Sequence, residues 1–114
     1  MIRELIEKDK TLVIDESYLA AVKGRAPLHE EFYLVLEKDI SRLGEDAIVA
    51  FQSPSNGVLA PLYADVLAYV CYKATQQNLT LKPSNAYDAG KIRAILGNKV
   101  AGDLEHGYQF RRVA

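Results

Sequence analysis

The sequence predicts one small soluble domain that mixes helices and strands, of the α/β or α+β class. Three observations support this prediction: apolar residues recur at helical spacing in several segments, short β-branched runs separate those segments, and the composition is that of a globular chain. A length of 114 residues leaves room for a single domain, 1–114. We expect about five helical segments around a central apolar helix, with a short sheet of three or four strands. The order of the elements does not by itself decide between the two classes.

The N-terminal part of the chain contains two short helices and one strand in this interpretation. Residues 2–8 have their apolar positions on one face and predict an opening helix. The run 11–14 favours a strand, and Asp15 directly after it is a good N-cap for a helix over 17–22. The segment 23–27 contains a glycine and a proline, which end that helix.

A longer helix and a buried strand follow. Apolar side chains recur at helical spacing between residues 29 and 43, and Gly44 ends the helix. Residues 47–51 are a short apolar run with β-branched side chains, which predicts a buried strand. The segment 53–57 consists of serine, proline, asparagine and glycine, the residues that turns favour.

The most apolar helix is predicted between about residues 58 and 77. Pro61 falls in its first turn, where the missing N–H costs little. Apolar side chains cover more than one of its faces, so we expect this helix to be the central one. Asp65 and Lys73 interrupt it, and it falls short of the roughly 20 apolar residues that a membrane span needs. We therefore expect no membrane partner.

The C-terminal part is predicted to hold a strand, a helix and a final strand. Residues 79–81 favour a strand that Pro83 stops, and Ser84 or Asn85 can cap the helix that follows. The inward positions of that helix are predicted to be Ala89, Ile92, Ile95 and Leu96. The tail 107–113 alternates between apolar and polar residues, which predicts the final strand.

One cysteine and two histidines limit the chemistry that the chain can perform. Cys71 cannot form an internal disulfide and the N-terminus shows no signal-peptide pattern, so we expect a cytoplasmic protein. His29 and His106 lack further ligands at the spacing of a zinc site. We predict no catalytic, cofactor-binding or metal-ligating residue and no cofactor, and an enzymatic role is the less favoured interpretation.

The two halves of the sequence differ in charge. Residues 1–57 carry seven basic and eleven acidic side chains, whereas residues 58–114 carry seven basic and four acidic ones. The candidate nucleic-acid contacts in the basic half are Lys91, Arg93, Lys99, Arg111 and Arg112. The same charges also fit a solvated face, or head-to-tail association of copies with acid against base. A sequence pI near 6.1 argues against strong non-specific binding to nucleic acid.

A second candidate site is the loop between the predicted strand 47–51 and the apolar helix. Free backbone N–H groups at a strand–turn–helix junction suit an anion. The candidate anion-binding residues are Ser53, Ser55, Asn56 and Gly57. The loop matches neither the Walker pattern nor the dinucleotide glycine fingerprint, and a plain turn with a helix cap is the alternative interpretation.

Together these observations favour a non-enzymatic protein-interaction or accessory module, of a bacterial or phage kind, that binds another protein or itself. The absence of a catalytic pattern, the tyrosine-rich apolar helix and the divided charge motivate this hypothesis. Two alternatives stay open. One is a nucleic-acid-binding protein that uses the basic C-terminal half, and the other is a small enzyme that binds an anion or other ligand at the loop 53–57.

Overall fold

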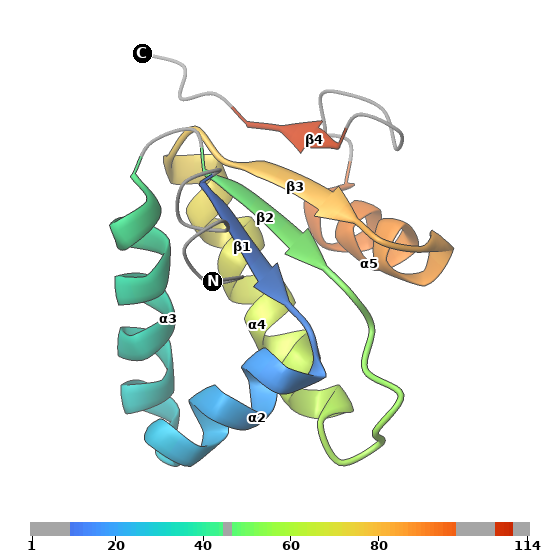
Figure 1. Cartoon of the computed structure of the whole chain (residues 1–114). Helices are drawn as coiled ribbons and strands as arrows, with labels where there is room; N and C mark the ends of the chain where they lie inside the picture. Colours follow the sequence, from blue (N-terminus) through green and yellow to red (C-terminus); the bar gives the residue numbers. More distant parts are fainter. Residues whose placement is uncertain (1–9, 45–46, 98–106, 111–114) are drawn as a thin grey trace.

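A computed structural model describes residues 10–44, 47–97 and 107–110 of the chain. In sequence order the elements are β1 (Thr11–Ile14), α2 (Glu16–Arg25), α3 (His29–Leu43), β2 (Ile48–Phe51), α4 (Ala60–Gln76), β3 (Thr80–Pro83), α5 (Ala86–Leu96) and β4 (Tyr108–Gln109). These described residues form four helices and one four-stranded sheet (Figure 1). Because the sheet is mixed, the chain is a small α+β domain, one of the two classes that the sequence predicts.

The four strands follow one another across the sheet in sequence order. The strands β1, β2 and β3 are parallel, with Thr11 beside Ile48 and Ile48 beside Thr80. The strand β4 runs antiparallel to β3, with Thr80 beside Gln109. Parallel neighbours need a crossover connection, which α2 and α3 supply between β1 and β2, and α4 supplies between β2 and β3.

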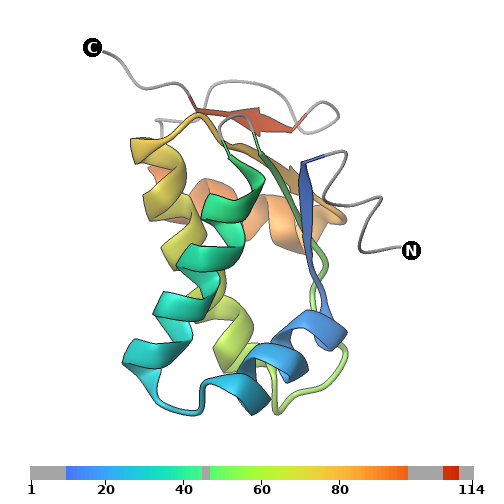
Figure 2. The same cartoon turned by 60° about the vertical axis from the view of Figure 1, so that its left-hand side comes forward.

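Helices α3 and α4 cover one face of the sheet, and α5 packs against α4 and β3 (Figures 1 and 2). The buried strand residues are Leu12, Ile14, Val49, Phe51, Leu81 and Tyr108. Their neighbours along β1 and β2 are only partly buried, which is the alternation expected of a sheet with one covered face. The core therefore lies between the sheet and this helical layer. The carboxyl ends of β1 and β2 meet at the same edge.

The helix ends follow local signals in the sequence. The side chain of Asp15 accepts a hydrogen bond from the backbone N–H of Tyr18 at 2.9 Å, which confirms it as the N-cap of α2. Asn85 accepts from the N–H of Asp88 at 3.1 Å and caps α5 in the same way. Gly44 follows α3 with a φ of 78°, a conformation that glycine adopts without strain.

Four of the five predicted helical segments are confirmed, and the fifth, 2–8, lies outside the described residues. The central position of the apolar helix is not confirmed. Helix α4 lies between α3 and α5 in the helical layer, and Tyr72 on its outer side is 58% exposed. None of the described helices is long and apolar enough to cross a membrane.

Three details differ from the prediction. Ile95 is predicted to point inward but is 44% exposed, because it lies outside the buried stripe of α5, which consists of Asp88, Ala89, Ile92 and Leu96. Pro83 was expected to follow the strand, but it is the last residue of β3, at a position where the missing N–H is tolerated. Of the predicted strand 107–113, only Tyr108–Gln109 pairs within the described residues.

Candidate functional site

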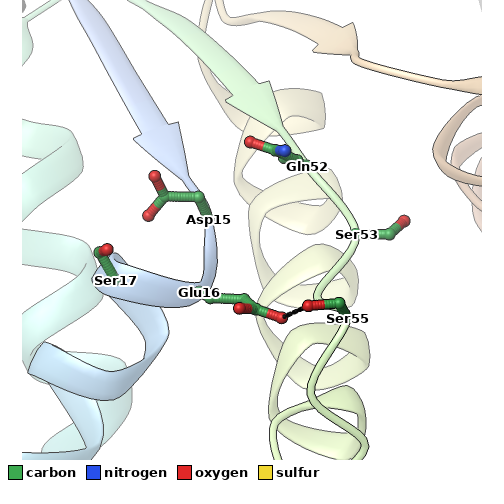
Figure 3. Close-up of a pocket in the computed structure, with 6 residues that line it drawn as sticks. All are labelled: Asp15, Glu16, Ser17, Gln52, Ser53 and Ser55. Atoms are coloured by element: carbon green, nitrogen blue, oxygen red, sulfur yellow. Dashed lines mark hydrogen bonds between the residues drawn. The ribbon is translucent and has the colours of Figure 1, made fainter.

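Polar side chains gather where β1 and β2 end. Asp15, Glu16 and Ser17 follow β1, while Gln52, Ser53 and Ser55 follow β2 (Figure 3). These six residues line an open pocket of about 240 Å³. The pocket forms because parallel strands end at the same edge of a sheet, which is where α/β proteins commonly bind ligands.

The predicted anion-binding loop already holds a carboxylate of the chain itself. The hydroxyl of Ser55 donates to Oε1 of Glu16 at 2.7 Å, and the backbone N–H of Asn56 donates to the same oxygen at 2.6 Å (Figure 3 draws the first bond). These two hydrogen bonds lower the pKa of the Glu16 carboxyl. The loop is therefore a carboxylate-binding turn that joins the start of α2 to the start of α4.

Three further polar groups of the loop also have internal partners. The side chain of Asn56 accepts from the N–H of Val58 at 2.9 Å, and the carbonyl of Gly57 accepts from the N–H of Ala60 at 3.4 Å. The hydroxyl of Ser53 points away from Glu16 (Figure 3) and donates to Asp88. An external anion would have to displace these bonds, and the anion-binding role of the loop stays a prediction.

A fully buried carboxylate lies behind the pocket. Both Ser53 and Tyr63 donate hydroxyl hydrogen bonds to Oδ1 of Asp88. Asp88 has no exposed surface, and its second oxygen, Oδ2, has no hydrogen-bond partner among the described residues. Burial and the bond to Asp88 raise the pKa of the Tyr63 hydroxyl above its usual value. Tyr63 therefore stays protonated and acts as a hydrogen-bond donor.

Asp88 is not among the predicted site residues, although the sequence contained a signal for it. It lies four residues before Ile92 and eight before Leu96, on the stripe of α5 that faces the core. An acidic residue on an inward stripe needs hydrogen-bonding partners, because an unpaired buried charge is costly.

The charge of the strand-end pocket does not match an anion. Its lining contains two carboxylates, one amide and three hydroxyls, and no basic side chain. Asp15 is engaged in capping α2, and Glu16 in holding the loop. Within the described residues, no group of three or more His, Cys, Asp or Glu side chains could hold a metal ion.

The predicted nucleic-acid contacts fall into two groups. Lys91 and Arg93 both lie on α5, but a separation of two residues points them to different faces of the helix. The ammonium group of Lys91 lies 5.3 Å from the centre of the Tyr87 ring. Lys99, Arg111 and Arg112 lie outside the described residues. A shared basic surface therefore stays a prediction.

An apolar groove of about 650 Å³ lies between α4 and α5 and is here called the α4–α5 groove. Its lining residues are Ala64, Leu67, Ala68, Ala86, Tyr87, Gly90, Lys91, Ala94 and Ile95. Five of these are alanine or glycine. Tyr87 and Ile95 stand beside them, 55% and 44% exposed. This combination of small and large apolar side chains leaves an open apolar surface that no described residue covers.

The tyrosines of α4 contribute less to the surface than their number suggests. Tyr63 is buried, and Tyr69 stacks on Tyr33 with ring centres 4.6 Å apart while its hydroxyl donates to Glu37 at 3.0 Å. Only Tyr72 of the three is mostly exposed. The accessible apolar surface of this helix pair is thus the α4–α5 groove rather than a tyrosine face.

Comparison with protein-family models, with curated proteins and with solved structures found no significant match.

Proposed function

We propose that this protein is a non-enzymatic protein-interaction module that binds an α-helix in the α4–α5 groove. The observation that carries the proposal is the uncovered apolar groove itself, with Tyr87 and Ile95 exposed along it. Apolar patches of this kind on small proteins commonly mark interaction sites. Aromatic and aliphatic side chains beside a small-residue floor supply the anchors on which protein interfaces depend.

The shape of the groove favours a helical partner. Ala64 and Ala68 on α4 are four residues apart, and so are Ala86, Gly90 and Ala94 on α5. Small side chains at intervals of four leave a straight channel along each helix. A row of side chains from another helix, also spaced by four, fits such a channel.

The chemistry of the groove supports binding rather than catalysis. Among the described residues that line it, Tyr87 and Lys91 are the ionisable ones, and these two contact each other. The only cysteine, Cys71, is buried, and burial raises the pKa of its thiol to about 12, so this thiol stays protonated and unreactive. A free, protonated thiol also fits the cytoplasmic location that we propose for this module.

Cross-linking from within the groove tests the proposal. A photoreactive p-benzoylphenylalanine at Ala68 should form an adduct with a protein in the producing cell. Ala94→Arg on the same chain should abolish the adduct, because a long charged side chain then fills the groove. The matched control carries the photoreactive residue at Thr75, which is exposed on the same helix outside the groove. An adduct that survives Ala94→Arg, or no adduct at Ala68, would contradict the proposal.

Ligand binding at the strand-end pocket is a second candidate function. The unpartnered Oδ2 of Asp88, connected to the pocket through Ser53, favours it. The acidic, hydroxyl-rich lining suits an amine or a sugar better than an anion. Calorimetric titration with a simple diamine and a simple sugar should show binding that Ser53→Ala weakens. No heat with either compound, or equal binding by the variant, would exclude this candidate.

A further inference from the structure

We propose that another pocket of the protein binds a free α-amino acid with an apolar side chain. This pocket, here called the α3–α4 pocket, lies where the turn between α2 and α3 meets the start of α4. Its lining comes from residues between 23 and 32 and between 58 and 65, and its volume is about 260 Å³. The proposal goes beyond the function of the α4–α5 groove, whose described lining residues are all different.

Most of the lining of the α3–α4 pocket is apolar. Ala26 and Phe32 are buried, and Leu62 is partly buried against the core. Val58 stands beside them with 70% of its surface exposed. Pockets for drug-sized molecules measure roughly 300–1,000 Å³. A volume of about 260 Å³ therefore suits a molecule of the size of one amino acid rather than a peptide, with its side chain against the apolar wall.

Opposite charges line this pocket without pairing with each other. Lys23, in the last turn of α2, contributes an ammonium group, and Asp65, in the second turn of α4, contributes a carboxylate. Neither side chain forms an ion pair with any described residue. The two groups therefore lie too far apart to neutralise each other directly, and a ligand that carries both charges can contact both.

Asp65 lies on the side of α4 that faces α3. It precedes Tyr69 by one helical turn, and the Tyr69 ring stacks on Tyr33 with ring centres 4.6 Å apart. Burial and, after it, the charge of Asp65 raise the pKa of the Tyr33 hydroxyl. His29, which also lines the pocket, packs edge-on against Tyr33 at 4.5 Å between ring centres. The carboxylate and the imidazole thus face the same pocket from two helices.

The three polar side chains of the described lining match the two ends of an amino acid. Lys23 and His29 can donate hydrogen bonds to its carboxylate. His29 is also the first residue of α3, where the positive end of the helix favours an anion. Asp65 can accept from the ammonium group. A simple carboxylate would be repelled by Asp65 and a simple amine by Lys23, so a ligand with both charges fits the pocket best.

An NMR titration of the full chain with leucine and two truncated analogues tests the proposal. Leucine should shift the amide signals of the residues around the pocket. The analogue 4-methylpentanoate lacks the amino group and 3-methylbutylamine lacks the carboxyl group. Each should bind about fivefold more weakly, a factor in keeping with the loss of one partly exposed ion pair. No shift with leucine, shifts confined to residues elsewhere, or equal binding of the three compounds would overturn the proposal.

Two charge-removing variants add a test that a loss of folding cannot mimic. Asp65→Asn should weaken leucine binding about fivefold and bind 4-methylpentanoate more tightly than the wild type does, because the repelling charge is gone. Lys23→Met should weaken leucine binding likewise and bind 3-methylbutylamine more tightly. Both positions are exposed, so the fold should tolerate the changes.

Lys38→Met is the matched control for these variants. It removes the same charge from an exposed position of α3 outside the pocket lining, and it should bind leucine as the wild type does. Variants at Lys23 and Asp65 that keep the wild-type order of the three compounds would overturn the assignment of the two charges. A loss of leucine binding in Lys38→Met equal to that in Lys23→Met would overturn it as well.

Discussion

At the residue scale, the buried carboxylate of Asp88 is the feature that most constrains the region around the strand-end pocket. It joins the loop after β2 to α4 and α5 through the hydroxyls of Ser53 and Tyr63. A buried carboxylate with one unpartnered oxygen depends strongly on the donors that remain. The hydrogen bonds to Asp88 therefore hold the loop after β2, α4 and α5 together at one point.

Removing one donor tests this role. Tyr63→Phe should lower the free energy of unfolding by about 1–3 kcal/mol, because the Asp88 oxygen then loses a buried hydrogen bond. Urea unfolding measures the change. Tyr72→Phe, at an exposed position of the same helix, is the matched control and should change stability by less than about 0.5 kcal/mol. Equal effects at both positions would contradict the structural role of the buried network.

Glu16 should make the stability depend on pH. Its hydrogen bonds to Ser55 and Asn56 lower its pKa in the folded state below the ordinary value of 4.5. A group whose pKa is depressed by folding stabilises the fold above its unfolded pKa, and this contribution disappears as the pH falls through the folded pKa. Stability should thus fall as the pH drops below 4.5, and less so in Glu16→Gln. Parallel acid titrations of the two proteins, followed by urea unfolding, would reveal whether their profiles differ.

At the element scale, α5 serves two surfaces at once. Its inner stripe, Asp88, Ile92 and Leu96, completes the core, while its outer rows form one side of the α4–α5 groove. The N-cap Asn85 fixes where the helix begins, and hence the directions in which its inner and outer side chains point. Gly90 on the outer side of α5 weakens the helix, and a Cβ added there would meet no described atom within 4 Å.

Gly90→Ala should therefore stabilise the protein. The expected gain is about 0.5–1 kcal/mol, the preference of a helix interior for alanine over glycine. Thermal unfolding at a concentration where the protein is monomeric isolates this effect. Ala94→Gly in the next turn of the same exposed row should give a loss of similar size. A destabilised Gly90→Ala monomer would show that the chain itself needs the glycine.

At the scale of the whole molecule, charge and topology favour contact with protein over contact with nucleic acid. The formal net charge is −1, and the two basic residues of α5 point to different faces. The helical layer leaves its own outer surface uncovered between α4 and α5. Association through that apolar surface should vary little with salt.

Nucleic acid provides the contrasting prediction. Fluorescence anisotropy with a DNA duplex and with a single strand should show no binding at physiological salt, because few phosphates could be neutralised at once. Binding with a steep salt dependence that Arg111→Gln and Arg112→Gln together reduce would contradict this expectation and favour the basic C-terminal half as the functional surface.

Much of the secondary structure could be predicted because its causes are local. The periodicity of 29–43 predicts α3 over the residues that form it. Asp15 and Asn85 cap the helices that they were expected to cap. Capping and amphipathic spacing act over a few neighbouring residues, so both can be recognised in a single sequence. The candidate site was predicted less well. The loop 53–57 does bind a carboxylate, but that carboxylate is Glu16 of the same chain.

The amino-acid sequence by itself determined the number and order of most described elements and that the domain combines helices with strands. Only the tertiary structure decided that Ile95 faces outward, that Asp88 is enclosed by Ser53 and Tyr63, and that the small residues of α4 and α5 face one groove. These features depend on contacts between segments far apart in the chain, as in the 35-residue separation of Ser53 and Asp88 and the 25-residue separation of Tyr63 and Asp88. Such contacts follow from how whole helices pack on the sheet, and local spacing and capping carry no information about that packing.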